Sequence, residues 1–512
     1  MAWVVLSFDF YWLYKAVALT VSVLVTFLRI RRVAGTDWGP RLERLADPTA
    51  GLRLLGARLD AVEARVALLE SSGQRRAAAG GRRTVAALRQ EQRELQRLVA
   101  GGVEVVDPGS LIQAVLVPTY TEPYATLEAT VRALDEAAWP VERKIVAIIT
   151  RASDGPGREN VARLQETFAG RFGQFIHILD PLEPGIVVGK SSAMACGGRQ
   201  LYRLLHEQGL DPRRVIVTDL DSDYRVHPAY FHYLAYRFAS DPDRARRLYQ
   251  PVPMFHNNLW QVPFLVRLVA VGATEMQMWR SLDPERLVSF SSYAVALETV
   301  HEAGYWATDA IPEDSRFYWR AFFRFAGQFR AEPLFIPIYG DAVRAQTYLR
   351  TLVQQYLQIR RWAWGVTDIP YFVGQSLRHP EIPLGQRLRR LAQLWWDHLQ
   401  WALAPFVLVF GTNLPLLLNP AFRETTLGQN LPFYAALMLT FALCLLVLLI
   451  YIEDAIAPPR PAEWGMLRRL GSYLGWLALP ISGLVFTLLP ALDAQTRLLA
   501  GRYLEYRVTE KA

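Results

Sequence analysis

Four long apolar segments constrain this chain more than any other feature of its sequence. They cover Phe10 to Leu28, Trp401 to Leu418, Leu431 to Ile452 and Leu470 to Leu489. Each has about the length that an α-helix needs to cross the hydrocarbon core of a bilayer. Hydrophobic residues make up 52% of the chain and its mean hydropathy is +0.10, which is high for a soluble enzyme. We therefore expect an integral, multi-pass membrane protein.

The distribution of charge predicts which ends of these segments face the cytoplasm. The arginine-rich stretch Arg29 to Arg32 directly follows the first segment, and arginines mark cytoplasmic flanks. A secretory signal would instead carry its charges before the segment and a cleavage site after it. The net charge of +8 also admits nucleic-acid binding, but the arginines cluster beside apolar segments, so no nucleic-acid partner is expected. Cys196 and Cys444 are too few for a disulfide framework or a cysteine metal site.

A charged helical region is predicted between residues 40 and 100. A Gly/Arg-rich linker, SGQRRAAAGGRRT, separates its first helix from a second one over Thr84 to Val99. A short coiled-coil repeat is typical either of dimerisation or of packing on the same chain, and its length of under three heptads favours the second. The apolar repeat of the first helix consists of Leu52, Leu55, Leu59, Val62, Val66 and Leu69.

Between residues 111 and 221, short β-rich segments alternate with helical ones. The β-rich segments are LIQAVLVPTY, RKIVAIIT, QFIHIL and RRVIVTDLD, and the helical ones are TLEATVRALDEA, ENVARLQETFAGRF and AMACGGRQLYRLLHEQ. This alternation predicts an α/β domain with a parallel, Rossmann-like sheet. Ligands of such sheets bind at the carboxyl ends of the strands, so the residues that follow each strand are the candidates for function.

Three carboxylates follow the fourth β-rich segment, in DLDSDYRVHP. Asp219, Asp221 and Asp223 alternate, and a cation among them would relieve their mutual repulsion. Mg²⁺ and Mn²⁺ bind carboxylate oxygens and also the oxygens of phosphates. A helix cap or a solvated acidic turn is the alternative, but the position at the end of a central strand favours a metal site.

The segment VVGKSSAM invites a phosphate-loop interpretation that its spacing does not support. Three residues separate Gly185 from Gly189, whereas a P-loop has four between its glycines. A P-loop ATPase is therefore not expected. Lys190 remains a candidate for contact with a phosphate or a donor sugar.

Two later segments combine charged and aromatic residues. AIPEDSRFYW places Glu313 and Asp314 at the start of a predicted helix, where compensation of the helix dipole is the simpler explanation. QQYLQIRRWAWG is typical of an amphipathic helix on a membrane surface. That explanation fits the helix as a whole but does not account for all these segments together. The polar and aromatic residues of the second segment are Gln358, Arg361 and Trp362.

In this order, VPTYTEP, DSD, PED and QIRRW resemble the motifs of the membrane-embedded family 2 glycosyltransferases, the group of cellulose synthase and hyaluronan synthase. The similarity runs from about Leu111 to Gly365 and then through the apolar segments. Thr121 stands where the family usually has Asn, and Pro312 where it has Thr; neither departure removes a charge. The resemblance implies a GT-A (Rossmann-like) glycosyltransferase domain inserted between transmembrane helices, with interfacial helices.

The resemblance also implies roles for the matched residues. Asp221 and Asp223 would hold Mg²⁺ or Mn²⁺ against the diphosphate of a nucleotide-sugar donor, expected to be a UDP-sugar. Asp314 would be the general base of an inverting reaction. The other implied donor-binding residues are Pro118, Thr119, Tyr120, Glu122, Asp154, Lys190 and Arg361. The implied acceptor-binding residues are Glu313, Gln358, Trp362, Ser292 and Tyr293, with Gln250 on a nearby strand.

The last segment, YRVTEK, is similar to the FxVTxK gating segment of the same family, which implies a lid over the donor site. Such a lid must be cytoplasmic. Arginines flank Leu470 to Leu489 on both sides, and Pro480 lies within it. We therefore expect this segment to enter the membrane and return, or to lie along the interface, and not to cross. The matching residues of the lid are Tyr506, Val508, Thr509 and Lys511.

The predicted organisation has six parts. They are an N-terminal transmembrane helix (1–32), a charged helical or short coiled-coil segment (40–100), a GT-A catalytic domain (108–345), interfacial helices with QxxRW (346–397), membrane helices (398–495) and a cytoplasmic tail (496–512). The catalytic domain is expected on the cytoplasmic side of the cell membrane.

The expected function is a metal-dependent, inverting hexosyltransferase that extends a β-linked polysaccharide from a nucleotide sugar. Two alternatives stay open: transfer of a single sugar to a lipid acceptor, and a non-catalytic membrane scaffold or receptor. The expected partners are a UDP-sugar donor, a polysaccharide or lipid-linked acceptor and membrane lipid. Four apolar segments are few for a channel that passes a polysaccharide, which leaves open a homodimer or an enzyme that does not translocate its product.

Overall fold

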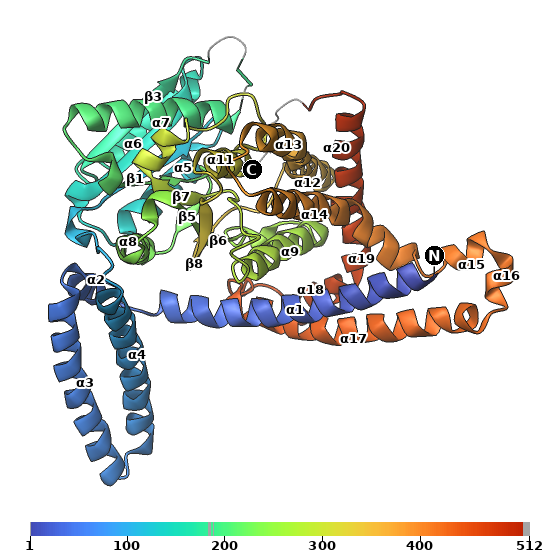
Figure 1. Cartoon of the computed structure of the whole chain (residues 1–512), viewed down its shortest axis with the longest axis horizontal. Helices are drawn as coiled ribbons and strands as arrows, with labels where there is room; N and C mark the ends of the chain where they lie inside the picture. The colour runs from blue at the N-terminus through green and yellow to red at the C-terminus, as the bar shows by residue number, and fades with distance from the viewer. Residues whose placement is uncertain (1, 183–185, 188, 505–512) are drawn as a thin grey trace.

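The computed structural model describes residues 2–182, 186–187 and 189–504 (Figure 1). An α/β domain occupies one side of the molecule, and two long helices run beneath it and past it. A helical hairpin projects from the end of the first of these helices. Beside the α/β domain lie α9 (Phe264–Arg280), α12 (Tyr348–Ala363), α13 (Asp368–Arg378) and α14 (Leu384–Phe410), and α9 packs against α1.

The α/β domain is built on a mixed sheet, which has eight strands in the described part of the chain, in the order β3-β2-β1-β4-β7-β6-β8-β5. The strands β1 to β4 are parallel to one another, as the sequence predicts. Their bounds are β1 (Ile112–Pro118), β2 (Lys144–Arg151), β3 (Gln174–Asp180) and β4 (Val215–Asp219). The α/β fold class is thus confirmed.

Beyond β4 the sheet contains antiparallel pairs, which the four predicted strands did not indicate. There β7 (Tyr293–Ala296) runs antiparallel to both β4 and β6 (Arg247–Met254), β8 (Arg330–Tyr339) is parallel to β6, and β5 (Arg225–Val226) pairs antiparallel with β8. Tyr293, the first residue of β7, pairs with Asp219, the last residue of β4. The reversal therefore brings the loop before β7 to the edge where β1 and β4 end.

Both faces of the parallel strands are buried, which explains why they are apolar throughout. Val115 and Val117 of β1 belong to one hydrophobic cluster, whereas Leu116 between them belongs to another on the opposite face. Successive side chains of a strand point to opposite faces, so helices on both sides must cover such a strand. The helices of the domain are α5 (Tyr124–Glu136), α6 (Gly155–Thr167), α7 (Lys190–Glu207), α8 (Tyr230–Ser240), α10 (Leu297–Glu302) and α11 (Glu313–Arg324).

The projecting hairpin consists of α3 (Pro48–Ser71) and α4 (Arg75–Ala100), joined to the rest by α2 (Gly39–Ala46). The predicted apolar repeat of α3 packs against α4 of the same chain. The two helices approach closely at Gly81, where an added Cβ would lie 2.4 Å from a methyl carbon of Val66. The predicted Gly/Arg-rich linker is shorter than expected, because helix α4 already begins at Arg75; the small residues serve helix packing.

Two of the predicted membrane segments form long helices, α1 (Ala2–Ala34) and α17 (Thr426–Ile456), which lie side by side. In the described part of the chain, three helical stretches are long and apolar enough to cross a membrane, at 6–34, 426–456 and 466–499. The expected span at Trp401–Leu418 is not among them. Its helix α14 ends at Phe410, and a turn separates it from the short helices α15 (Leu414–Leu418) and α16 (Pro420–Arg423).

The third stretch is helical without a reversal, so the enter-and-return form expected for Leu470 to Leu489 is wrong. It joins α18 (Met466–Leu474), η7 (Gly475–Ala478), α19 (Leu479–Gly483), η8 (Leu484–Leu488) and α20 (Leu489–Leu499). Pro480 lies in the first turn of α19, and Pro490 in the first turn of α20, where a proline is tolerated. In Figure 1 the stretch runs across the direction of α1 and α17 and ends beside α12.

Candidate active site

A cavity of about 1170 Å³ opens where β1 and β4 end, and it continues among the long helices. Its wall includes the ends of these strands, the loop before β7, the first turn of α11 and the inner face of α12. Further along, residues of α1, α9, α14 and α17 line the same cavity. One space therefore connects the carboxyl edge of the sheet with the apolar helices.

Four carboxylates surround the ammonium group of Lys190. Its Nζ atom lies 3.2 Å from Asp219 Oδ1 and 2.8 Å from Asp221 Oδ1 at the end of β4. On the other side it lies 3.5 Å from Glu313 Oε1 and 3.4 Å from Asp314 Oδ1, in the first turn of α11. Glu313 and Asp314 thus begin a helix, as the sequence predicts, and they also join the acidic group at the end of β4.

The local sequence explains why Lys190 can reach this position. It begins α7, and α7 packs tightly on the sheet at Gly197, where an added Cβ would lie 2.4 Å from the Cδ1 atom of Ile149. An ammonium group at a helix N-terminus is unfavourable with respect to the helix dipole. The four carboxylates compensate for this and hold the side chain in the cavity wall.

Burial and like charges shift the pKa values in this group. Burial raises the pKa of Asp314 well above its ordinary value, and the neighbouring carboxylates add to the shift, whereas Lys190 opposes it. Burial likewise raises the pKa of Asp219 to about 7. Burial alone would lower the pKa of Lys190, but attraction to the carboxylates outweighs it, and the net shift is well upward. Lys190 therefore stays charged, and Asp314 is a stronger base than an ordinary carboxylate.

The residues that follow β1 form another part of the wall. Thr119 Oγ1 donates to Glu122 Oε2 at 2.8 Å, and the backbone N–H of Tyr120 donates to the same oxygen at 2.7 Å. This local ring of hydrogen bonds fixes the turn and leaves the Tyr120 ring exposed, with the Arg151 guanidinium 4.8 Å from its centroid. All the donor-binding candidates between Pro118 and Glu122 line the cavity.

The loop before β7 holds two of the carboxylates. Ser291 donates from its backbone N–H to Asp314 Oδ2 at 3.0 Å and from its hydroxyl to Asp221 Oδ2 at 2.6 Å. Its φ of 58° is unusual for a residue other than glycine, and such strain is concentrated at functional sites. The buried amide of Gln250 braces the loop, accepting from Phe290 N and donating to the carbonyl oxygens of Phe290 and Ser292.

Besides Gln250, three predicted site residues do not reach the cavity wall as far as the structure describes it. Ser292 and Tyr293 are fully buried behind the loop, where the Ser292 hydroxyl accepts from Asp221 N and the Tyr293 hydroxyl accepts from Trp306 Nε1. Asp154 caps α6, accepting from Gly157 N at 3.0 Å. Because β2 extends to Arg151, the side chain of Arg151 faces the cavity and that of Asp154 does not.

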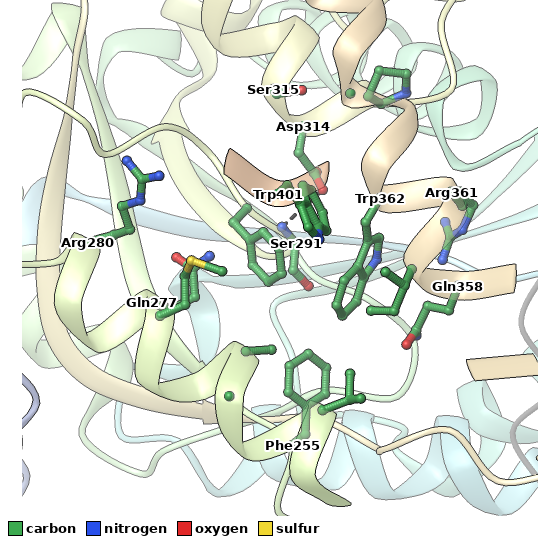
Figure 2. A pocket seen from close by; sticks show the side chains of 18 of the residues that line it. Phe255, Gln277, Arg280, Ser291, Asp314, Ser315, Gln358, Arg361, Trp362 and Trp401 are labelled. Atoms are coloured by element: carbon green, nitrogen blue, oxygen red, sulfur yellow. Dashed lines mark hydrogen bonds between the residues drawn. The ribbon is translucent and has the colours of Figure 1, made fainter. Parts of the chain in front are cut away.

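Helix α12 carries the residues of QIRRW. Gln358, Arg361 and Trp362 all line the cavity, and Figure 2 shows them together on one side of it. The Trp362 ring lies edge-on to Phe290, with ring centroids 5.6 Å apart, so α12 and the loop before β7 face one another. Arg360 points the other way and pairs with Asp493 of α20 at 2.8 Å.

The carboxylates suit a metal ion that the substrate helps to bind. Among the described residues, no group of three or more His, Cys, Asp or Glu side chains is arranged to hold a metal ion. Asp221 and Asp223 do line the cavity together, however. Mg²⁺ is often held by one or two carboxylates, with substrate phosphates and water completing its shell. The residues present therefore fit such an ion, and they do not form a closed protein site.

Several wall residues were not expected from the sequence. Ser289 and Ser291 carry no motif of their own, and they reach the site because β7 is antiparallel. Lys15 of α1 and Arg280 of α9 also line the cavity, from segments that lie far apart in the sequence. A charge inside the first apolar segment was the one available signal for Lys15. The predicted gating residues Tyr506, Val508, Thr509 and Lys511 lie outside the described residues.

Comparisons with known proteins give distant likenesses. No protein-family model matches the chain, and no curated protein matches it. Among solved structures, the mannosyltransferase PcManGT from Pyrobaculum calidifontis, in complex with GDP-Man and Mn²⁺, is similar with 17% identity and a TM-score of 0.43, over 88% of this chain and 100% of that chain. S. aureus TarS 1–349, in complex with UDP-GlcNAc, is similar with 12% identity and a TM-score of 0.36, over 78% and 93%.

Proposed function

We propose that the chain is a membrane-bound, inverting glycosyltransferase that uses a nucleotide-sugar donor. The observation that carries this proposal is the grouping of Asp314, Lys190 and Asp221 with Arg361 and Trp362 around one cavity. This cavity combines a buried base, a pair of carboxylates suited to a metal ion, a guanidinium suited to a diphosphate and an aromatic face suited to a sugar ring. We also propose that the chain is related to the cellulose synthase and hyaluronan synthase group.

In the proposed reaction, Asp314 accepts the proton of an acceptor hydroxyl while its oxygen attacks the anomeric carbon of the donor. The bond between that carbon and the diphosphate breaks, and the nucleoside diphosphate leaves with the electron pair. Arg361 binds the diphosphate, and Trp362 stacks on a sugar face. Attack from the face opposite the leaving group inverts the anomeric configuration, so an α-linked donor gives a β-linked product. The charge of Lys190 opposes the upward shift of the Asp314 pKa and so favours the ionised form that accepts the proton.

Asp221 and Asp223 would hold Mg²⁺ or Mn²⁺, which neutralises charge on the leaving diphosphate when bound. The hydrogen bond from Ser291 to Asp221 orients one of these carboxylates for the role. Lining residues from Thr119 to Glu122, together with Arg151, are proposed to bind the nucleoside.

For the acceptor, we propose a growing β-linked polysaccharide first, with transfer of a single sugar to a lipid as the second candidate. The second is favoured by one observation: leucines and aromatic rings of the long helices line the other end of the cavity. The catalytic domain is proposed to lie on the cytoplasmic side, with α1 and α17 in the membrane and the stretch 466–499 along the interface.

The test uses the whole chain, purified in detergent. It is supplied with UDP-glucose, UDP-GlcNAc and UDP-glucuronate, each with Mg²⁺ or Mn²⁺, and the release of UDP and the length of the products are measured. Long products support the polysaccharide and a single-sugar lipid supports the second candidate. No UDP release from any donor, with an Asp314→Asn variant behaving like the wild type, would leave the scaffold alternative.

The Asp314→Asn variant also tests the assignment of the base. We expect a loss of transfer of at least about 10²-fold, the lower end of what general bases contribute, with donor affinity kept. Loss of donor binding in this variant would contradict the assignment, because a base that contacts the acceptor hydroxyl is not needed to hold the diphosphate.

A further inference from the structure

Two cationic side chains line the cavity from the helices on the membrane side. Lys15 comes from the N-terminal third of the first apolar segment, in α1, and Arg280 ends α9. Asp397 and Gln400 of α14 line the cavity beside them. The catalytic steps proposed above do not use any of these four side chains.

Lys15 is not neutralised by a direct ion pair. Its Nζ atom donates to Gln400 Oε1 at 3.1 Å and lies 4.5 Å from the centroid of the Trp279 ring. Among the described residues, no carboxylate oxygen lies within 4.0 Å of this ammonium group. A lysine inside an apolar membrane segment is costly and marks a functional site when it faces a cavity. The hydrogen bond and the aromatic ring orient the ammonium group, but neither partner carries a negative charge.

Arg280 uses only part of its guanidinium in a pair with protein. Its Nη2 atom lies 2.8 Å from Asp397 Oδ2, and its buried Nη1 atom has no hydrogen-bond partner among the described residues. A buried donor without an acceptor is destabilising unless a ligand supplies one. Lys15 and Arg280 together with Asp397 carry a net charge of +1, so this part of the wall favours an anion.

The position of this group separates it from the proposed donor site. Figure 2 shows Arg280 and Arg361 on opposite sides of the pocket, with Asp314 between them. The donor diphosphate is assigned to Arg361, so an anion at Arg280 belongs to the other substrate. Most of the remaining wall here is apolar and comes from α1, α9, α17 and the 466–499 stretch; it includes Leu19, Leu268, Leu446, Leu449, Leu479 and Phe486. The polar side chains that these elements add are Glu275, Gln277, Ser482 and Thr487.

We propose that Lys15 and Arg280 bind the phosphate group of a lipid-linked acceptor. The apolar chain of the acceptor occupies the space between the long helices, and its sugar hydroxyl reaches Asp314. This rests on the proposed glycosyl transfer, and it favours the second acceptor candidate, a lipid, over the polysaccharide. A neutral polysaccharide would leave both cations without a counter-charge and would place hydroxyl groups against leucines, which is unfavourable. A phosphate joined to an apolar chain satisfies both parts of the wall.

The test measures binding to the full chain in detergent without any donor, so that it is independent of turnover. The probes are farnesyl phosphate, farnesol, inorganic phosphate and a short oligoglucuronate. We expect farnesyl phosphate to bind at least about tenfold more tightly than farnesol, because charge-assisted hydrogen bonds to phosphate are absent from the alcohol. Inorganic phosphate should bind far more weakly than farnesyl phosphate, because it lacks the apolar chain.

Variants then assign the preference to the two cations. Lys15→Gln and Arg280→Gln should each bring the affinity ratio of farnesyl phosphate to farnesol down several-fold, and Lys15→Arg should keep it. Matched controls are Arg29→Gln on α1 and Arg267→Gln on α9, whose guanidinium groups lie over Phe335 and Trp260 and are not among the described cavity residues. Both controls should keep the wild-type ratio. The comparison of probes on wild-type protein stands even if a glutamine variant does not fold.

Equal affinity of wild-type protein for farnesyl phosphate and farnesol would overturn the proposal. Binding of inorganic phosphate as tight as that of farnesyl phosphate would overturn the lipid part. Tight binding of oligoglucuronate that Lys15→Gln abolishes would assign the cations to an acidic glycan instead. If farnesyl phosphate binds as expected but no donor releases UDP with any acceptor, the acceptor site stands and the proposed transfer fails.

Discussion

Replacement of Lys190 by methionine is the most informative perturbation of the carboxylate group. The ammonium lies 3.4 Å from Asp314 Oδ1, and both side chains are at least three-quarters buried. With an effective dielectric constant of about 20, the attraction between two unit charges at this distance is about 5 kcal/mol. Since 1.36 kcal/mol corresponds to a change of one in a pKa, its full loss would raise the pKa of Asp314 by about 3 to 4.

The expected change is smaller, because the other carboxylates respond. Asp219, whose pKa is already raised to about 7, also takes up protons in the variant, which removes part of the repulsion. We therefore expect the acid limb of the pH–rate profile to move upward by about two pH units. The sign follows from the proposed role of Asp314 as the base. A base accepts a proton only when ionised, so activity is lost as the pH falls through its pKa, and a higher pKa moves that loss to higher pH.

The assay is the pH dependence of kcat/KM for UDP release by wild type, Lys190→Met and Lys190→Arg. Lys190→Arg keeps the charge and should keep the acid limb within about half a pH unit of the wild type. Thermal unfolding of all three proteins excludes a general loss of structure. If Lys190→Met is active with an unchanged acid limb, or if both variants shift it equally, the electrostatic role assigned to Lys190 is wrong.

Two further predictions follow from the site. Asp154→Ala should leave the KM for the donor unchanged. It should lower the free energy of unfolding by about 1 kcal/mol, because the Asp154 carboxylate caps α6. A large rise in KM with unchanged stability would instead show that Asp154 contributes to donor binding. Treatment with EDTA should reduce UDP release at least about tenfold, and added Mg²⁺ or Mn²⁺ should restore it. The reason is that Asp221 and Asp223 suit an ion shared with the diphosphate. Full activity in excess EDTA would show that the reaction needs no metal ion.

The parallel half of the sheet was predictable from local patterns. The strands β1 to β4 are short apolar runs bounded by amphipathic helices, and both patterns can be recognised in a short stretch of consecutive residues. The positions of Asp221, Asp314, Arg361 and Trp362 on the cavity wall also followed from their motifs. Distant motifs meet there because strands of a parallel sheet end at one edge and the following residues are brought together.

The antiparallel half and its consequences were not predictable from local patterns. Direction in a sheet depends on which strands pair, and a four-residue strand such as β7 carries no mark of its orientation. That direction decides that Ser291 reaches Asp314 and Asp221 while Ser292 and Tyr293 turn into the core. In the same way, β2 continues one residue beyond the predicted segment RKIVAIIT and ends at Arg151. Arg151 therefore faces the cavity, while Asp154 caps a helix.

The apolar segments also differ in how far the sequence predicted them. Composition alone identified α1 and α17, because a long apolar helix is recognisable from hydropathy. Whether Trp401–Leu418 and Leu470–Leu489 bend, end or continue depended on packing, since turns and prolines are tolerated where neighbouring helices satisfy the backbone. The sequence thus determined which charged and aromatic motifs this chain carries and the half of the fold built from consecutive residues. The tertiary structure alone decided that the charge of Lys190 lies among four carboxylates, and that Lys15 and Arg280 share their cavity, because only long-range packing brings such distant side chains together.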